Sequence, residues 1–583
     1  MIDAYELYCV LWRRIVLSGR EEIVSTDVKA CRTDSELVSY VQQLLDASGL
    51  LQQIYFSGDC KNEAKAIEIR KLGNESFRPK IKKYIKAIEH YNESIALSNV
   101  GSENLAIAYA NRSAICFELK EYHECLENIR LAQQNPYPVH LLPKLLKRKN
   151  DCLEIINNHV SKPGNVRFEP KLCYKPNPKI PHISDCLEFK RDDFFGRHLV
   201  TNRNLKAGDV VIIEKPFSVL LEAELRYLNC DYCQQDKFLT LIPCSNCSIT
   251  MFCSEICLQR AYESYHRIEC PVIKHMQSLF TKVILMALRT TTMAISTFDY
   301  NLEELQQHVE MLGETSSNPF DLDWGNAHAK DIYSTIHGLA TNQKIRYPSD
   351  LIQRSIYSIV MSSALLSNTP LNSLCGSNES HRNLIRLLIF RHAQTSPVSM
   401  HSTGYINYCP NEEDPFQSAK LGCASFPILS MLNHSCAPNL TRLTLPTGQV
   451  AAILNRPIKK GGQLYDDYGY HHCIETLYER QIGLLQRFNF KCQCEACINN
   501  YPLYYHLKRL KLSPGHKNFG TLEWDDIAKA VKKIPQLCKF LNEYDNQYPN
   551  FEVSTAQEAL LQCLQIVYFG KSRKIKYRGL CCF

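Results

Sequence analysis

Residues 230–270 read CDYCQQDKFLTLIPCSNCSITMFCSEICLQRAYESYHRIEC, and this stretch decides how the middle of the chain folds. Its metal-ligand residues follow the spacing C-x2-C-x10-C-x2-C-x5-C-x3-C-x8-H-x3-C. A C-x2-C pair turns two thiolates toward one ion, and C-x3-C or H-x3-C does so across a helical turn. Free or disulfide-linked cysteines at chance spacing are the weaker alternative. The stretch therefore predicts two closed, structural zinc sites built from Cys230, Cys233, Cys244, Cys247, Cys253, Cys257, His266 and Cys270.

A second group of cysteines, CQCEAC, begins at Cys492. Cys492, Cys494 and Cys497 offer three thiolates, one fewer than a closed structural zinc site needs. The fourth ligand has to come from another part of the chain, and the spacing alone leaves its identity open. We expect a third metal ion here.

The overall composition is that of a globular protein with several folded units. The chain has 583 residues, against about 150 for a typical domain. Hydrophobic residues make up 45% and charged residues 22%, which excludes a mainly disordered or fibrous chain. The net charge of +7 is too small to favour direct nucleic-acid binding.

The cysteine content also indicates a compartment. We find no export signal and no run of about 18 apolar residues, so we expect no membrane segment. The chain has 27 cysteines, and clustered thiols in a reducing compartment hold metal more often than they form disulfides. The expected locations are therefore the cytoplasm and the nucleus.

The N-terminal part has helical periodicity. From Lys65, four segments place apolar residues at i, i+3 and i+4, and they pair as two helical hairpins with small residues at recurrent positions. The run AYANRSAICFELKEYHECLENIRLAQQNP, residues 108–136, resembles the tetratricopeptide repeat. We expect a third, degenerate helix pair at 142–158. Such repeats would bind a peptide or dock on the C-terminal helices, and a bundle that serves only as scaffold is the alternative.

The second half begins with short β-rich runs. Phe195–Thr201 and the run that begins at Leu205 surround a Lys-Ala-Gly-Asp turn, which predicts a small antiparallel sheet. Helical periodicity returns over residues 271–400, strand-like sequence follows, and the last part is again helical.

Three later segments carry motifs that together resemble a known family. Residues 433–439 read NHSCAPN, residues 461–469 read GGQLYDDYG, and residues 488–497 read FNFKCQCEAC. In this order they resemble the SET lysine methyltransferase domain. With the cysteine-rich stretch and the helical repeats ahead of them, they resemble the SET and MYND domain-containing protein family.

The resemblance implies a mixed α+β fold. N-terminal tetratricopeptide-like repeats would precede a split SET β-domain with an inserted MYND zinc finger, a post-SET zinc segment and a C-terminal helical region. The expected divisions are a helical lead-in (1–64), the repeats (65–160), a linker (161–185), the first part of the SET domain (186–229), the MYND finger (230–270), a helical insert (271–400), the second part of the SET domain (401–470), the post-SET segment (471–500) and the C-terminal helical region (501–583).

The resemblance also implies how the metal ligands are shared among three zinc ions. Two ions would be bound by interleaved sets within the finger, and Cys436 would complete the third site. The three sets are Cys230, Cys233, Cys253 and Cys257; Cys244, Cys247, His266 and Cys270; and Cys436, Cys492, Cys494 and Cys497.

The implied function is S-adenosylmethionine-dependent methylation of lysine in a histone or non-histone protein, acting in transcriptional regulation. Methyl transfer is an in-line displacement, so the enzyme mainly aligns the lysine nitrogen with the sulfonium methyl and excludes water. Tyr468 would be the catalytic residue and would orient the amine, since a phenol with a pKa of about 10 is a poor base at neutral pH. The implied cofactor-binding residues are Phe195, Gly196, Arg197, Ser399, Ser430, Asn433, His434, Tyr468 and Phe490.

One position departs from the family pattern, and simpler roles compete with the catalytic ones. Ser399 stands where relatives usually have asparagine, and Pro397 is expected to interrupt the helix there. Taken alone, Tyr468 fits an ordinary sheet tyrosine and His434 a core histidine. The alternative function is a catalytically weak, zinc-stabilised adaptor. It would recruit transcriptional repressors or deacetylases through the MYND finger and a peptide partner through the repeats.

Overall fold

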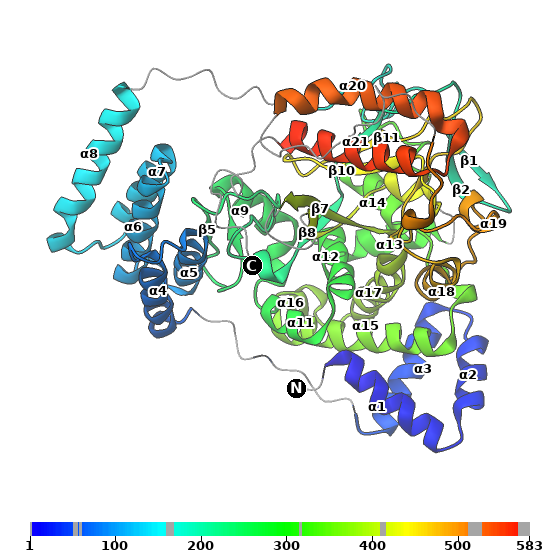
Figure 1. Cartoon of the computed structure of the whole chain (residues 1–583). Coiled ribbons are helices and arrows are strands. Elements are labelled where there is room, and N and C mark those ends of the chain that lie inside the picture. Colours follow the sequence, from blue (N-terminus) through cyan, green and yellow to red (C-terminus); the bar gives the residue numbers. More distant parts are fainter. Residues whose placement is uncertain are drawn as a thin grey trace.

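The computed structural model describes residues 3–50, 56, 61–158, 168–313, 318–408, 416–510 and 527–569. It combines helices with small sheets, as expected from the sequence (Figure 1). The predicted basic tail that begins at Lys571 lies outside the described residues. Among the described helices, none is long and apolar enough to cross a membrane.

The strands join two parts of the chain that are far apart in sequence. In one sheet, β3 (Val210–Glu214) pairs with β11 (Val450–Leu454), which pairs with β10 (Leu440–Thr444). In another, β4 (Ser218–Leu221) pairs with β8 (Phe416–Ser425), which pairs with β7 (Met400–Tyr408). All five residues of β11 are buried because helices cover this sheet, so its sequence VAAIL is apolar throughout. The split β-domain that the sequence predicts is therefore assembled.

Two further strand pairs flank the candidate site. β1 (Leu187–Asp192) and β2 (Gly196–Thr201) form an antiparallel hairpin. The short strands β9 (Asn433–His434) and β12 (Tyr465–Asp466) pair in parallel. This second pair brings the NHSC segment beside the residues that lead into Tyr468.

The insert between the two parts is a helical bundle that also holds the N-terminal helices. α1 (Ala4–Leu17), α2 (Glu21–Ala30) and α3 (Asp34–Ala47) share one hydrophobic core with α15 (Pro348–Asn368) (Figure 1). The helical lead-in is confirmed, but its docking site was not predicted. The remaining insert helices are α11 (Ile273–Leu279), α12 (Lys282–Thr297), α13 (Leu302–Leu312), α14 (Ala329–His337), α16 (Leu371–Cys375) and α17 (Glu379–Ser399).

The expectation that Pro397 interrupts a helix is wrong. α17 continues through Pro397 to Ser399. Proline removes one backbone donor from a helix, and this position lies in the last turn, where only two further residues follow. Ser399 is therefore presented from the end of a continuous helix.

The repeat region consists of two helical hairpins and one further helix. α4 (Glu63–Phe77) packs on α5 (Tyr84–Leu97), and α6 (Glu103–Glu118) packs on α7 (Tyr122–Gln133). The predicted third pair is wrong, because a single helix, α8 (Leu142–Asn158), follows. Gly73 explains the close packing of the first hairpin, since a Cβ there would lie 2.5 Å from the Tyr91 ring. The tetratricopeptide assignment stays a prediction.

Within the part of the chain that the structure describes, the repeats do not dock on the C-terminal helices. They share a core with the cysteine-rich stretch, and α5 lies beside β5 (Ile242–Pro243) (Figure 1). The C-terminal helices α20 (Ile527–Tyr544) and α21 (Phe551–Phe569) instead pack on the sheet formed by β10, β11 and β3. The elements that complete the cysteine-rich regions are β6 (Met251–Phe252), α9 (Glu255–Ala261), α10 (Arg267–Glu269), α18 (Leu477–Phe488) and α19 (Glu495–Ile498).

Candidate active site and metal centres

The structure gathers the predicted metal ligands into three groups of four, whose ligand atoms all lie within 4.8 Å of one another. The grouping is the one that the family resemblance implies, including Cys436 as the fourth ligand of the last group. Cysteines of the described residues are all free thiols. We call the groups the first tetrad (Cys230, Cys233, Cys253, Cys257), the second tetrad (Cys244, Cys247, His266, Cys270) and the third tetrad (Cys436, Cys492, Cys494, Cys497).

The distances within the tetrads fit zinc. A tetrahedral ion with Zn–S bonds of about 2.3 Å separates two sulfurs by about 3.8 Å. The Sγ atoms of Cys233 and Cys253 are 3.6 Å apart, and those of Cys244 and Cys270 are 3.7 Å apart. In the third tetrad, Cys436 and Cys497 are 3.6 Å apart. Soft thiolates in this arrangement suit a closed structural zinc site.

A fourth group, His471, His472 and Cys473, also brings three ligand atoms together. However, one ring nitrogen of His472 lies 3.0 Å from the Pro502 carbonyl oxygen and the other lies 2.7 Å from the Tyr548 hydroxyl. Because both nitrogens of His472 are engaged, we assign no metal to this group.

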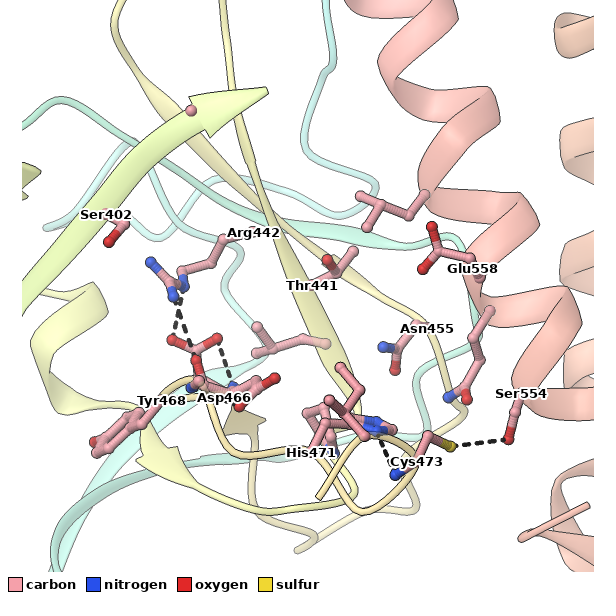
Figure 2. Close-up of a pocket in the computed structure, with 18 of the residues that line it drawn as sticks. Ser402, Thr441, Arg442, Asn455, Asp466, Tyr468, His471, Cys473, Ser554 and Glu558 are labelled. Carbon is pink, nitrogen blue, oxygen red and sulfur yellow. Dashed lines mark hydrogen bonds and ion pairs between the residues drawn. The ribbon is translucent and has the colours of Figure 1, made fainter. Parts of the chain in front are cut away.

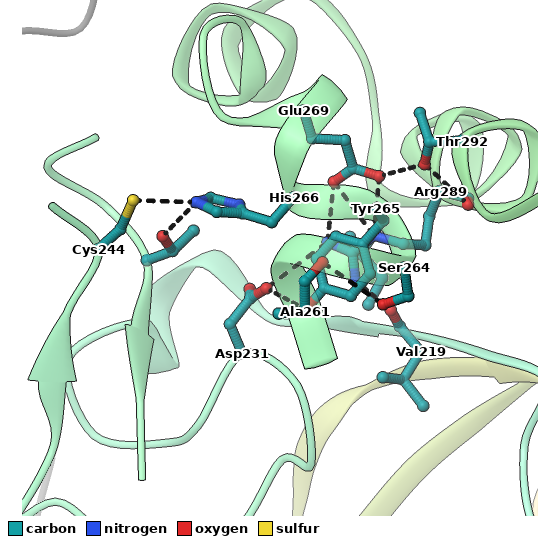
Figure 3. Close-up of polar contacts among 12 residues, drawn as sticks. Val219, Asp231, Cys244, Ala261, Ser264, Tyr265, His266, Glu269, Arg289 and Thr292 are labelled. Carbon is teal, nitrogen blue, oxygen red and sulfur yellow. Dashed lines mark hydrogen bonds and ion pairs between the residues drawn. The ribbon is translucent and has the colours of Figure 1, made fainter. Parts of the chain in front are cut away.

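A buried ion pair fastens the cysteine-rich stretch to the rest of the fold (Figure 3). Arg289 on α12 donates from Nε and Nη2 to both carboxylate oxygens of Glu269 at 2.9 to 3.1 Å, and from Nη1 to the Val219 carbonyl oxygen at 2.6 Å. Its guanidinium carbon also lies 3.5 Å from the centre of the Tyr265 ring. Glu269 precedes the metal ligand Cys270, so the pair ties the second tetrad to α12 and β4.

The predicted catalytic tyrosine is held by the NHSC segment. The Tyr468 amide donates to Nδ1 of His434 at 3.1 Å, and its hydroxyl donates to the Leu432 carbonyl oxygen at 2.6 Å. Burial raises the pKa of Tyr468 well above the ordinary value of 10. The side chain is therefore a neutral phenol that can orient a substrate, not a general base.

The His434 ring has a structural role. Nδ1 accepts from Tyr468, and Nε2 lies 3.3 Å from Sγ of Cys436 in the third tetrad. Burial lowers the pKa of His434 to about 4, so the ring is neutral. Since both nitrogens are engaged, any cofactor contact predicted for His434 would come from its backbone.

The other predicted cofactor residues lie close together on one side of Tyr468. The Asn433 amide donates to the Phe195 carbonyl oxygen at 2.8 Å, which links β9 to the loop before β2. Gly196 has φ +60 and open space where a Cβ would stand, so this backbone leaves room for a ligand. The Phe195 ring is 41% exposed. Phe490 packs near His434, with ring centroids 6.3 Å apart. An exposed aromatic ring, an open glycine and an amide side chain fit an adenosyl cofactor.

Arg197, Ser399 and Ser430 complete the predicted set. Arg197 donates to the Gly338 carbonyl oxygen at 3.1 Å, which anchors β2 to the end of α14. The Ser430 hydroxyl donates to the Ser399 carbonyl oxygen at 3.1 Å. The end of α17 is thereby tied to the turn that leads into β9.

A cavity of about 1840 Å³ lies beside Tyr468, between the β-domain and α21 (Figure 2). Ser399 and Ser430 of the predicted cofactor set also line it. This volume is larger than the 300–1000 Å³ of an ordinary small-molecule site. Ser554 and Glu558 of α21 face Asn455, Arg442 and Tyr468 across it (Figure 2). The cavity therefore has room for a segment of polypeptide.

The cavity wall carries acidic and basic side chains, among them the ion pair of Asp466 and Arg442. Asp466 is buried and accepts from Nε of Arg442 at 2.7 Å. The Arg509 guanidinium lies 4.1 Å from the centre of the Phe551 ring. Glu558, in contrast, accepts a hydrogen bond from Gln562 at 3.3 Å and forms no ion pair with any described residue. Desolvation by burial raises the pKa of the Glu558 carboxyl.

A buried carboxylate positions the turn before the NHSC segment. Glu214 on β3 accepts from the backbone amides of Ile428 and Leu429 at 2.8 and 2.9 Å. Burial raises the pKa of Glu214 to about 8. Sequence reasoning missed Glu214, Glu269 and Arg289. A lone charged residue within an apolar run was a signal for Glu214 and Arg289, but Glu269 lies beside Arg267 in a polar segment and offered none.

Comparisons with known proteins agree with this arrangement. A family model described as the SET domain matches residues 196–469. The chain is 25% identical over 506 residues to protein-lysine N-methyltransferase SMYD4 of Danio rerio, covering 75% of this chain and 66% of that protein. It is 26% identical over 609 residues to SMYD4 of Gallus gallus, covering 81% and 80%. A SET and MYND domain-containing protein of Dictyostelium discoideum is 24% identical over 311 residues, covering 52% and 50%.

The assembled β-domain and the family model together define a SET-domain protein. The chain is thus similar to proteins of the SET and MYND domain-containing family. It spans 66% of the zebrafish relative, slightly less than two thirds of that protein's length.

Proposed function

We propose that this protein is an S-adenosylmethionine-dependent protein-lysine N-methyltransferase. The observation that carries the proposal is the place of Tyr468. This side chain forms part of the cavity wall, while its amide is bonded to His434 in the segment that also holds Asn433 and the predicted cofactor side. A lysine that enters the cavity would therefore meet the cofactor at Tyr468.

S-adenosylmethionine, when bound, supplies a methyl group on an electrophilic sulfonium centre. The chain's own residues would position and desolvate the lysine. Tyr468, Phe488 and His434 form an aromatic group in which the ring centroids of Tyr468 lie 4.9 Å from Phe488 and 5.2 Å from His434. Such an apolar surface disfavours the ammonium form of lysine and so favours the neutral nucleophile. The Tyr468 hydroxyl donates a hydrogen bond to the Leu432 carbonyl oxygen, and this bond fixes the orientation of the two polar groups.

The size and charge of the cavity support a protein substrate with a basic segment. About 1840 Å³ accommodates several residues on either side of the target lysine. Glu558 faces this space without an ion-pair partner among the described residues, so a lysine or arginine near the target would find a carboxylate there. The substrate, whether histone or not, is thus proposed to be basic beside the methylated lysine.

We also propose three bound zinc ions, one in each tetrad. The third tetrad shares a hydrophobic cluster with Phe490 and Tyr468. The Cys436 amide also donates to Sγ of Cys494 at 3.3 Å. A metal in the third tetrad would therefore hold Phe490 against the cofactor side of Tyr468.

The proposal is tested by titrating the purified protein calorimetrically with S-adenosylmethionine and by measuring single-turnover transfer to lysine peptides. Tyr468→Phe should reduce transfer at least 10-fold with little change in cofactor affinity, because it removes one hydroxyl near the reacting atoms. Asn433→Ala should lower cofactor affinity about 5- to 150-fold, the equivalent of roughly 1 to 3 kcal/mol.

Tyr478→Phe is the matched control, since Tyr478 is 74% exposed on α18. It should leave both cofactor binding and transfer unchanged. If the wild type binds no cofactor at millimolar concentration and transfers no methyl group, the enzyme proposal fails. The adaptor function would then be the one to pursue.

A further inference from the structure

Three polar side chains are fully buried where the helical repeats meet the cysteine-rich stretch: Asn92 on α5, Arg112 on α6 and Asn128 on α7. Arg112 joins them, because Nη1 donates to Oδ1 of Asn92 and Nε donates to Oδ1 of Asn128, both at 2.6 Å. The amide oxygens are thereby used within the group. The Asn92 amide donates outward, whereas Asn128 Nδ2 also donates to the Glu124 carbonyl oxygen of its own helix at 2.7 Å. We call these residues the carbonyl-binding triad.

The triad donates to main-chain carbonyl oxygens of the cysteine-rich stretch and of the residues just before it. Asn92 Nδ2 donates to the Phe238 and Tyr227 carbonyls at 2.8 and 2.7 Å. Asn128 Nδ2 donates to the Leu239 carbonyl at 2.7 Å, and Arg112 Nη1 donates to the Leu241 carbonyl at 2.9 Å. All of these hydrogen bonds end on main-chain carbonyl oxygens, so they depend on the position of the backbone and not on the polar side chains of the loop.

Apolar side chains of the same loop fill the remaining space. Phe238, Leu239 and Leu241 are 2% exposed or less and belong to the same hydrophobic core as the repeat helices. The repeats therefore hold residues 238–241 as a receptor holds a peptide. The repeat surface at this interface, where the sequence analysis expected a peptide or the C-terminal helices, is covered by residues of the chain itself.

The loop is tied to a different tetrad at each end. Cys233, before the loop, belongs to the first tetrad, and Cys244, after it, belongs to the second. Lys61, at the entrance to α4, donates to the Cys244 carbonyl oxygen at 2.6 Å. Bound ions at both ends would fix where the loop carbonyls lie, whereas free thiols leave the loop ends without a cross-link.

The positive charge of Arg112 makes the docking sensitive to those carbonyl positions. Arg112 forms no ion pair with a described residue, and its Nη2 is buried without a hydrogen-bond partner. Neutral oxygen atoms and the Tyr109 ring, whose centre lies 5.3 Å from the guanidinium carbon, are the groups that compensate this buried charge. It loses much of that compensation when the loop carbonyl moves. Complete separation of the repeats, which exposes Arg112 to water, then has a lower free energy than a loosened interface in which Arg112 stays buried.

We propose that metal binding by the first and second tetrads controls docking of the helical repeats. With metal bound, the carbonyl-binding triad holds residues 238–241 and the repeats are fixed to the finger. Without it, the repeats separate as a unit and present a surface for main-chain carbonyls flanked by apolar side chains. The inference does not depend on the proposed methyltransferase activity.

The test uses the full-length protein and reads structure, not activity. Hydrogen exchange of residues 238–242 and of α5 to α7 is measured together with the radius of gyration from solution scattering. Zinc removal with a chelator should raise exchange in these segments at least 10-fold and increase the radius of gyration, and zinc added back should reverse both changes.

Variants separate the metal from the triad. Cys244→Ser should reproduce the effect of the chelator, while Cys494→Ser in the third tetrad should leave the repeats docked. Asn128→Ala should raise exchange of residues 238–242 without lowering the zinc content. Asn111→Ala is its matched control, because Asn111 donates to Asn74 within the repeats.

Three results would overturn the proposal. One is unchanged exchange of residues 238–242 in the zinc-depleted wild type. A second is an equal effect of Cys494→Ser and Cys244→Ser, since the metal would then act on the whole fold. The third is an Asn128→Ala protein that behaves like Asn111→Ala. The chelation and add-back experiment on the wild type decides the question even if Cys244→Ser does not fold.

Discussion

The Arg289–Glu269 pair should dominate the local stability of the second tetrad. Replacing Arg289 with methionine removes the contacts to both Glu269 oxygens and to the Val219 carbonyl. Glu269 is 1% exposed and would keep a neutral side-chain partner in the Thr292 hydroxyl, which donates to Oε1 at 2.8 Å. Leaving a buried charge uncompensated in this way costs about 3 to 5 kcal/mol.

Hydrogen exchange measures this loss of stability in the segment that contains Glu269. The free energy of opening for α9 to α10 should fall by that amount, which corresponds to exchange roughly 150- to 5,000-fold faster when the opening equilibrium sets the rate. The second tetrad should also release zinc to a chelating dye faster, because His266 and Cys270 lie in the same segment. Arg289→Lys should lie between the wild type and Arg289→Met, since lysine keeps the charge but not the forked geometry.

Two controls sharpen the test. Arg267→Met removes an exposed arginine from the neighbouring α10 and should change exchange by less than about 5-fold. The double variant Arg289→Met, Glu269→Leu replaces the whole pair with apolar side chains and should recover most of the lost protection. The reasoning is refuted if Arg289→Met shows the same exchange as Arg267→Met, or if the double variant is as unstable as the single one.

Three other predictions concern the active site. Cys494→Ser should lower the zinc content by one ion per chain in metal analysis and weaken cofactor binding through Phe490; unchanged cofactor affinity would separate the two sites. Glu558→Gln should weaken the binding of basic lysine peptides about 5- to 10-fold in fluorescence anisotropy and leave neutral lysine peptides unaffected. Because the pKa of Glu214 is raised to about 8 from 4.5, its stabilising contribution is complete below pH 4.5 and is lost as the pH rises toward 8. Glu214→Gln should therefore gain stability relative to the wild type over that range in thermal unfolding, and a constant difference would contradict the assignment.

Ligand spacing made the metal sites predictable from sequence. The motif order gave the split β-domain, and the pairing of β3 with β11 follows from it, because both runs are apolar enough to be covered on two faces. Ser399 and Ser430 were named as neighbours of the cofactor, and the structure joins them by a hydrogen bond.

Long-range docking could not be predicted in this way. The period of α3 shows that Leu37, Val41 and Leu45 are buried, but an apolar face carries no information about which helix will cover it. The same limit applies to the repeats. Arg112 and Asn128 are polar residues of the repeats, and their partners in the cysteine-rich stretch are carbonyls, which every residue possesses. Their acceptors could only be found in three dimensions.

The packing of the N-terminal helices on α15 has a consequence for how the protein is made. α1 to α3 leave the ribosome before α15, because the helix that covers them, Pro348–Asn368, is translated about 300 residues later. At roughly 5 to 20 residues per second this delay lasts tens of seconds. During that time the apolar faces of the newborn helices have no native cover, so nascent chains halted before Pro348 should recruit a holding chaperone that chains halted well after Asn368 release. Biosynthesis, and not the finished fold, is then the stage at which the lead-in is most prone to aggregation.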